Sequence, residues 1–145
     1  MTKFYFSLDK KGKLIRDKIE KNMIAQGHEV KSRQLSGNKL LQELFKKFPE
    51  EFKELEEASR AKDSDGEMEE LADLLTLIEG YMHARGFDEK AIGYIKQAKI
   101  AKSGAFNEGL FVEWIDLNPD SETYDFWAKH YRDRPEGYIE EKEVK

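Results

Sequence analysis

Apolar residues recur every three or four positions along most of the chain, a pattern typical of amphipathic helices. It predicts a first helix over 13–27, which ends at Gly27. A long second helix opens at 36–38 and carries Pro49 in its interior. Proline removes a backbone N–H and clashes with the preceding turn. We therefore expect a kink or a break over 45–49, with a gentle bend as the alternative.

The third helix is marked at both ends by residues with known capping roles. A loop is predicted over 61–66, and Ser64 followed by Glu67 is the pattern of a capping box. The helix then continues to Gly86, because glycine readily takes the left-handed conformation that ends helices. The short loop makes the second and third helices antiparallel neighbours.

The remaining segments predict one more core helix and short extended pieces. Asp88 caps a fourth helix over about 89–102. The aromatic segment 3–8 is predicted to be a strand or an extended arm, and 110–115 to be a strand that could pair with it. Segment 118–145 contains one short helix and a charged tail. The chain is therefore mainly α-helical, with four core helices.

Composition limits the kind of protein this can be. The 145 residues are 39% hydrophobic and 38% charged, with a net charge of -5, which suits one polar globular domain. The negative charge argues against nucleic acid as a partner and is compatible with a site for cations. The absence of cysteine excludes disulfides and thiolate chemistry. No apolar run resembles a membrane span or a signal peptide, so we expect a cytoplasmic protein without a membrane partner.

Acidic residues on the second and third helices do not follow a simple solvent-facing stripe. With Phe52 at zero, Phe48, Leu55 and Leu44 fall at about 280° to 320° and define the buried arc. Glu51 falls at about 260° and Glu54 at about 200°. On the third helix, with Leu71 at zero in the apolar arc, Glu70 and Asp73 fall at the same two angles, about 260° and 200°. Each helix thus directs one carboxylate into its apolar face and sets a second at the edge.

An antiparallel pair centred on residue 62 places Glu51 level with Asp73, and Glu54 level with Glu70. Four carboxylates then converge on one small volume. Burying like charges together is prohibitive unless protons or cations neutralise them. Oxygen ligands at this spacing suit Mg²⁺ or Mn²⁺. The sequence therefore predicts a metal site formed by these four residues.

A solvated charged face is the competing interpretation of the acidic residues. It remains the better interpretation for Glu56, Glu57 and Glu69, which point away from the apolar arc. Glu50 and Glu67 are intermediate, and Glu67 could serve only as a helix cap.

These motifs resemble those of the all-α nucleoside triphosphate pyrophosphohydrolases, the MazG-like group. The resemblance is carried by "EExxE" followed by "ExxD" in the two acidic helices. "KLIRDKI" (13–19) and "QAKIAKSGAFNEGLFVE" (97–113) are similar to the opening and closing stretches of the phosphoribosyl-ATP pyrophosphohydrolase-like branch. The resemblance covers about 13–115. This chain departs from the branch at Pro49, Glu20 and Ser103.

The resemblance implies an all-α fold with a four-helix MazG-like core and short extended segments at both ends. The domain would cover 1–117, and 118–145 would be an extension with a short helix and a charged tail. The implied reaction is the Mg²⁺-dependent (or Mn²⁺-dependent) attack of water on a nucleoside triphosphate, which releases the monophosphate and pyrophosphate. The implied assembly is a homodimer or a higher homo-oligomer.

Roles can then be assigned to individual residues. Glu51, Glu54, Glu70 and Asp73 are the predicted metal ligands, and Glu50 and Glu51 are the candidate catalytic carboxylates. Cations are needed where the metal leaves phosphate oxygens free. The candidates are Arg16, Lys18, Lys99 and Lys102. The alternative interpretation of these residues is ordinary surface charge or an ion pair, for example of Arg16 with a glutamate. Asp17 could cap, pair with a lysine or hold a second metal.

Three functions remain open from the sequence. The first is hydrolysis of a nucleoside triphosphate. The second is the same chemistry on phosphoribosyl-ATP, a nucleotide of histidine biosynthesis. The third, of a different class, is a helical interaction module without catalysis, which a metal-independent melting temperature would indicate.

Overall fold

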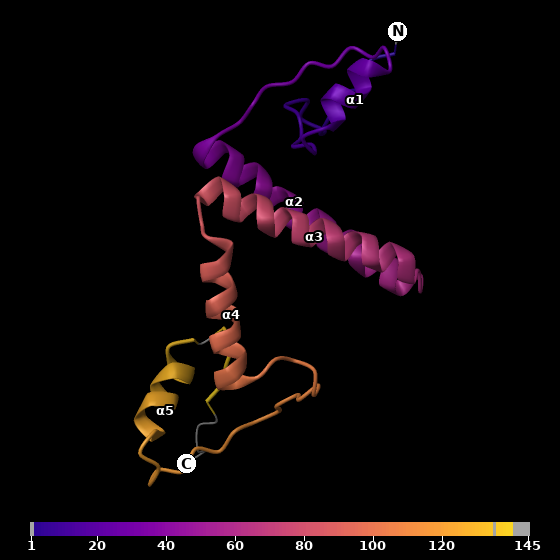
Figure 1. Cartoon of the computed structure of the whole chain (residues 1–145). Helices are drawn as coiled ribbons and strands as arrows, with labels where there is room; N and C mark the ends of the chain where they lie inside the picture. The colour runs from indigo at the N-terminus through magenta and orange to yellow at the C-terminus, as the bar shows by residue number, and fades with distance from the viewer. Residues whose placement is uncertain (1, 135, 141–145) are drawn as a thin grey trace. The chain divides into compact units, whose positions relative to one another are not determined.

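The computed structural model of the chain describes residues 2–134 and 136–140. It groups the chain into two compact units, Met1–Ser103 and Gly104–Lys145. The boundary predicted after residue 117 stays a prediction. The described residues form helices and no strand, which confirms the all-α class. The helices are α1 (Ile19–Ala25), α2 (Gly37–Arg60), α3 (Ser64–Arg85), α4 (Glu89–Ser103) and α5 (Tyr124–Arg132) (Figure 1).

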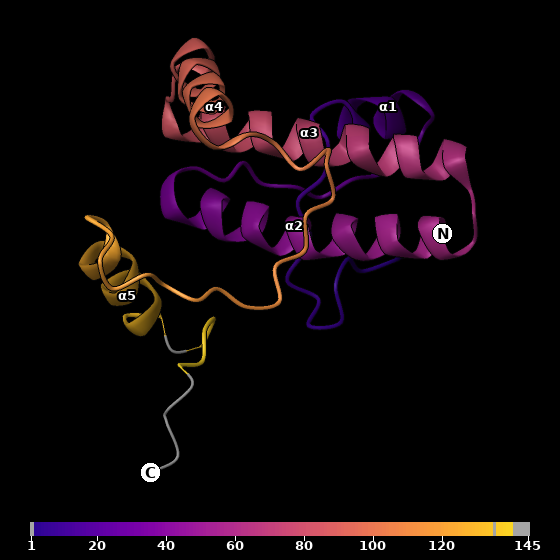
Figure 2. The ribbon, with the colours of Figure 1, turned by 90° about the horizontal axis from the view of Figure 1, so that it is seen from below.

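Helices α2 and α3 form an antiparallel pair, side by side along most of their lengths (Figures 1 and 2). Leu44 of α2 and Leu74 of α3 are buried, and the rings of Phe45 and Tyr81 meet with their centroids 5.4 Å apart. Among the described helices this is the one extensively packed pair. All four predicted helices are present, but within the described residues only α2 and α3 pack closely on each other, and α1 and α4 contribute no buried residue to a core.

The ends of α3 depend on Asp63 and Gly86. The Asp63 carboxylate accepts a hydrogen bond of 3.0 Å from the Gly66 N–H, so Asp63 caps the helix and the prediction of Ser64 was wrong. Ser64 is already the first helical residue, and an ionised cap also suits the positive end of the helix dipole. A Cβ at Gly66 would lie 2.5 Å from Asp63 Oδ2, so a larger residue there would displace the capping carboxylate. Gly86 ends α3 with a φ of 66°, as predicted.

Helix α2 runs through Pro49 without a break, so the break predicted over 45–49 is wrong. Proline at this position deprives the Phe45 carbonyl of its helical partner, but only that one bond is lost. Packing against α3 before and after Pro49 holds the helix together. Glu50 and Glu51 therefore lie in a helix interior, where the N-terminal dipole does not act on them.

Replacing Pro49 with alanine will stabilise the fold. Pro49→Ala restores the missing N–H and removes the ring clash, so we expect the free energy of unfolding to rise by up to about 3 kcal/mol. Urea denaturation measures this change. Pro119, which lies in a turn outside the helices, is the matched control, and Pro119→Ala should give no such gain. Equal stabilities of the two variants would mean that α2 accommodates Pro49 without cost.

The first helix is shorter than predicted. It begins at Ile19 rather than at residue 13, and Gln26 and Gly27 end it close to the predicted position. Segment 13–18 precedes it without helical structure up to the turn at Asp17. Lys13 in this segment forms an ion pair with Glu50 of α2, and Arg16 forms one with Asp73 of α3. These ion pairs hold the segment against α2 and α3 in a non-helical conformation.

Neither predicted strand forms in the described residues. Residues 3–8 enter a turn in which Gly12 N–H donates to the Phe6 carbonyl (3.2 Å), and 110–115 has no regular structure. A strand requires the open edge of another strand, and the backbone bonds of the first segment are local. The pairing of the two segments is therefore wrong. Trp114 in the second segment is 78% exposed.

The fourth helix and the C-terminal helix agree with the sequence. The Lys90 N–H donates to the Asp88 side chain (3.0 Å) as α4 begins. In the second unit, α5 stacks Trp127 on Tyr131, with ring centroids 5.9 Å apart. In the part of the chain that the structure describes, no helix has both the length and the apolar character to cross a membrane.

Candidate metal centre

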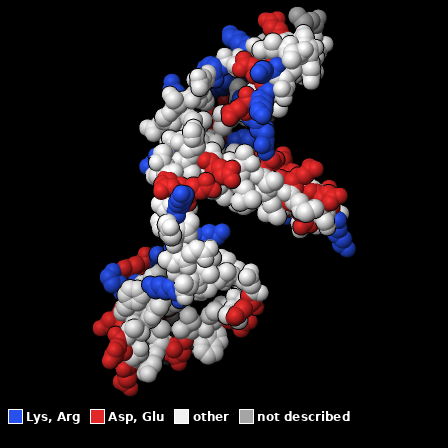
Figure 3. Space-filling model, viewed as in Figure 1, with Lys and Arg blue, Asp and Glu red and all other residues white. Residues whose placement is uncertain are grey.

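Three carboxylates meet where α2 faces α3. Glu51, Glu70 and Asp73 each offer an oxygen, and these three atoms lie within 4.8 Å of one another. Glu51 is buried at 7% exposure, and the other two are half-buried. Figure 3 shows acidic side chains gathered on the visible face of the α2–α3 pair. The predicted register thus brings three of the four expected ligands together.

Glu54, the fourth predicted ligand, is not part of the three-residue group among the described residues. Its side chain is exposed, at the edge of the apolar face, whereas the sequence had predicted it to converge with the other three. Its charge still acts on the group, since it is one of the causes that raise the pKa of Glu70. The structure therefore separates Glu54 from the other three.

Cationic side chains contact two of the three clustered carboxylates and the adjacent Glu50. Lys47 Nζ lies 2.9 Å from Glu51 and 3.2 Å from Glu50. Lys13 pairs with Glu50, and Arg16 pairs with Asp73. The negative charge at the centre is thus balanced in part by the chain itself.

Glu70 differs from its neighbours because no cationic side chain among the described residues forms an ion pair with it. Its Oε2 atom is buried and has no hydrogen-bond partner in the described part of the chain. Burial raises the pKa of Glu70, and the charges of Glu54, Glu51 and Asp73 raise it further. A buried carboxylate oxygen without a partner is costly. An oxygen-binding cation such as Mg²⁺ or Mn²⁺ would satisfy it, so these residues fit a metal.

Removing the charge of Glu70 will stabilise the metal-free chain, more strongly as the pH rises. Glu70 holds its proton more tightly when folded than when unfolded, so its ionisation opposes folding above its unfolded pKa. We expect Glu70→Gln to unfold at higher denaturant than the wild type in EDTA, with a difference that is small near pH 4 and grows toward pH 8. Denaturation at several pH values tests this, and a constant difference would contradict it.

Glu50 and Lys47 both stay charged in this arrangement. The hydrogen bond from Lys13 lowers the pKa of Glu50, which opposes the effect of burial, and Lys47 lowers it further. Burial lowers the pKa of Lys47, but the hydrogen bonds with Glu51 and Glu50 outweigh it and raise the pKa overall. While it is paired in this way, Glu50 is a weak proton acceptor.

The predicted phosphate-binding cations occupy different places. Arg16 lies before α1 and Lys18 at its N-cap, so neither is inside the helix that was predicted to carry them. Lys99 and Lys102 are exposed on α4, and the described structure gives them no ion pair with the three carboxylates. The structure thus places Arg16 at the acidic centre, in contact with Asp73.

Sequence reasoning missed Lys13 and Lys47. Lys47 could have been found, because it precedes Glu51 by four residues on the same helix and such pairs face each other. Lys13 is 37 residues from Glu50 in the chain, and no periodicity signals that contact.

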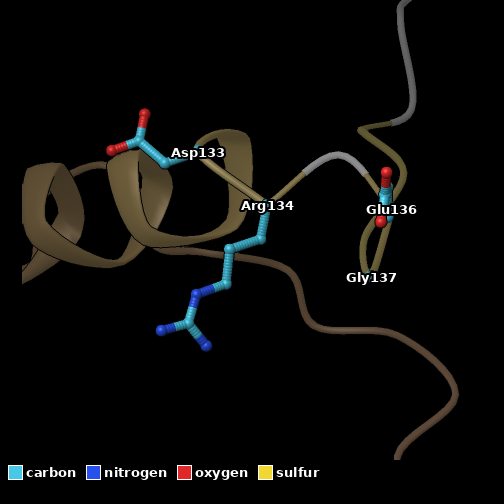
Figure 4. A pocket seen from close by; sticks show the side chains of 4 residues that line it. All are labelled: Asp133, Arg134, Glu136 and Gly137. Atoms are coloured by element: carbon cyan, nitrogen blue, oxygen red, sulfur yellow. The ribbon is translucent and has the colours of Figure 1, made fainter. Parts of the chain in front are cut away.

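A hollow in the second unit contains no comparable group. It is lined by Asp133, Arg134, Glu136 and Gly137 at the end of α5, and the side chains of Asp133 and Arg134 point in different directions (Figure 4). The Asp133 carboxylate is paired with Lys129. The chemistry expected of the chain therefore belongs to the acidic centre of the first unit.

Comparison with known families agrees with this assignment. The model of the phosphoribosyl-ATP pyrophosphohydrolase family matches residues 17–95, more than half of the chain. The matched range contains all of α2 and α3 and therefore the three carboxylates. Comparisons with curated proteins and with solved structures give no significant match.

Proposed function

Because the chain belongs to the phosphoribosyl-ATP pyrophosphohydrolase family, we propose that it hydrolyses a nucleotide between its α- and β-phosphates and releases pyrophosphate. Family members are pyrophosphohydrolases that act on acid anhydrides. The family favours phosphoribosyl-ATP as the substrate over an ordinary nucleoside triphosphate, which the sequence motifs alone had placed first.

The observation that carries the proposal is the carboxylate group around the unpartnered Glu70 oxygen. Glu51, Glu70 and Asp73 would hold Mg²⁺ or Mn²⁺, with Glu54 near enough to add negative charge. When bound, the metal neutralises phosphate charge and acidifies water. Phosphoryl transfer asks little more of a protein than positioning and charge balance.

The chain's own residues supply the remaining functions. Glu51 is buried and aligned by Lys47, so it is a fixed ligand rather than a mobile base. Glu50 is the neighbouring carboxylate that accepts the proton of the attacking water, and it must first leave Lys13, because that contact lowers its pKa. Arg16, Lys18, Lys99 and Lys102 are the proposed contacts of the phosphates.

We also propose a homodimer or higher homo-oligomer, since one chain leaves the apolar faces of α2 and α3 largely uncovered. Phe52 remains 55% exposed and Leu71 50%, although both belong to the predicted buried arcs. Exposed apolar surface of this kind typically marks an interface. Light scattering should give at least twice the 17.0 kDa of one chain, and a monomer at all concentrations would contradict the assembly.

Pyrophosphate release tests the reaction. The purified chain with Mg²⁺ is incubated with phosphoribosyl-ATP and with a panel of nucleoside triphosphates. The pyrophosphate and the nucleotide monophosphate that are released are quantified. We expect equal amounts of both products, with the highest kcat/KM for phosphoribosyl-ATP. A higher kcat/KM for a nucleoside triphosphate would identify an ordinary nucleotide as the substrate. Release of single phosphate, or no release from any nucleotide, would overturn the proposed reaction and favour an inert helical module.

A further inference from the structure

The ion pair between Arg16 and Asp73 joins a proposed phosphate-binding residue to a proposed metal ligand. Both side chains are accessible, with 59% of Arg16 and 37% of Asp73 exposed. Accessible ion pairs are weak and exchange readily. Arg16 also belongs to the non-helical segment before α1, so a change of partner for its side chain requires no helix to unwind.

The charges around Asp73 make this pair dependent on the metal. Without metal, Glu51 is balanced by Lys47 and Asp73 by Arg16. A divalent cation among the same carboxylates would replace that balance and repel the guanidinium. While the metal binds, Lys13, three residues before Arg16, would still hold its segment on Glu50, because that pair is given up only when Glu50 accepts the proton, so a released Arg16 stays close to the centre.

We propose that Arg16 is an exchangeable counter-ion. It pairs with Asp73 while the centre lacks metal, and it contacts the phosphates of the substrate when a divalent cation binds Asp73. The inference rests on the proposed function, because it concerns the same metal and the same nucleotide. Binding of metal and of polyphosphate are then coupled, each promoting the other. The metal-free chain then binds free nucleotide more weakly, since Arg16, one of its four proposed phosphate contacts, is already paired with Asp73.

Competition for Asp73 is tested first with the metal alone. Mn²⁺ affinity of the full chain is measured by electron paramagnetic resonance, without nucleotide. Arg16→Gln removes the competitor, so we expect Mn²⁺ to bind about two- to fivefold more tightly, the range that an accessible ion pair allows. Arg16→Lys should restore nearly wild-type affinity.

Arg60 provides the matched control, because it pairs with Glu56 on the exposed side of α2 at 3.1 Å. Arg60→Gln should leave Mn²⁺ affinity unchanged. If Arg16→Gln binds Mn²⁺ no better than Arg60→Gln, Arg16 does not compete with the metal and the exchange is overturned.

Release of Arg16 is tested in EDTA with pyrophosphate as the probe and calorimetry as the readout. Asp73→Asn and Glu70→Gln each remove one carboxylate charge from the same group, but only the first frees Arg16. We expect Asp73→Asn to bind pyrophosphate about fivefold more tightly than Glu70→Gln, and the gain to vanish in Arg16→Gln/Asp73→Asn. Equal affinities of the two single variants would overturn the exchange. Turnover is not measured here, so this failure would leave the proposed reaction standing.

Discussion

Glu51→Gln will lower kcat/KM for pyrophosphate release by about a thousandfold or more, because a metal typically supplies several kcal/mol of transition-state stabilisation. Glutamine keeps the size of the buried side chain but removes the charge that holds a cation. Steady-state kinetics with Mg²⁺ and phosphoribosyl-ATP measure the loss.

The fold of this variant should survive without metal. Lys47 loses its partner at 2.9 Å but keeps Glu50 at 3.2 Å. Glu57, an exposed glutamate of the same helix, is the matched control, and Glu57→Gln should keep full activity. If Glu51→Gln unfolds in EDTA, the role of Glu51 is to balance the charge of Lys47, and its assignment as a ligand is wrong.

Mn²⁺ or Mg²⁺ will raise the melting temperature of the wild-type chain by several degrees at neutral pH. A ligand that binds only the folded state stabilises it by about 2.7 kcal/mol when present at a hundred times its Kd. For a domain of this size each kcal/mol shifts the midpoint by roughly 3–4 °C. Thermal denaturation in EDTA and in excess Mn²⁺ measures the shift.

The same thermal denaturation experiments on Glu51→Gln distinguish binding of Mn²⁺ at the acidic centre from a general effect of salt. The variant should show little of the shift, because the most buried of the three carboxylates has lost its charge. An equal shift in both proteins would place the stabilising cation elsewhere, and no shift in the wild type is the behaviour of an inert helical module.

The α2–α3 pair could be predicted because its signals are local. Apolar periodicity placed both helices, and a short loop around residue 62 fixed their register. That register was enough to bring Glu51 beside Asp73 and Glu70. Glu54 lies outside this group because a side chain at the edge of the apolar arc can point either to the partner helix or to solvent. Its angle on the helix does not decide between these two directions.

Other features depend on contacts that no local pattern records. Lys13 and Arg16 reach residues 37 and 57 positions away, and these pairs hold their segment outside the helix that the apolar spacing favoured. Pro49 was expected to kink or break α2, with a gentle bend as the alternative, but the helix is not broken, because packing against α3 outweighs one lost hydrogen bond. The apolar segment 110–115 has the composition of a strand, but a strand also needs a partner edge.

Titration of Mn²⁺ into the wild type, Glu70→Gln and Glu69→Gln measures the metal centre most directly. Glu69 and Glu70 are neighbours in α3, but Glu69 is exposed and Glu70 has the buried oxygen without a partner. We expect one saturable site in the wild type, the same affinity in Glu69→Gln, and at least about a tenfold loss in Glu70→Gln, since a ligand charge is removed. Equal affinities of the two variants, or no saturable binding in the wild type, would contradict a metal held by Glu51, Glu70 and Asp73.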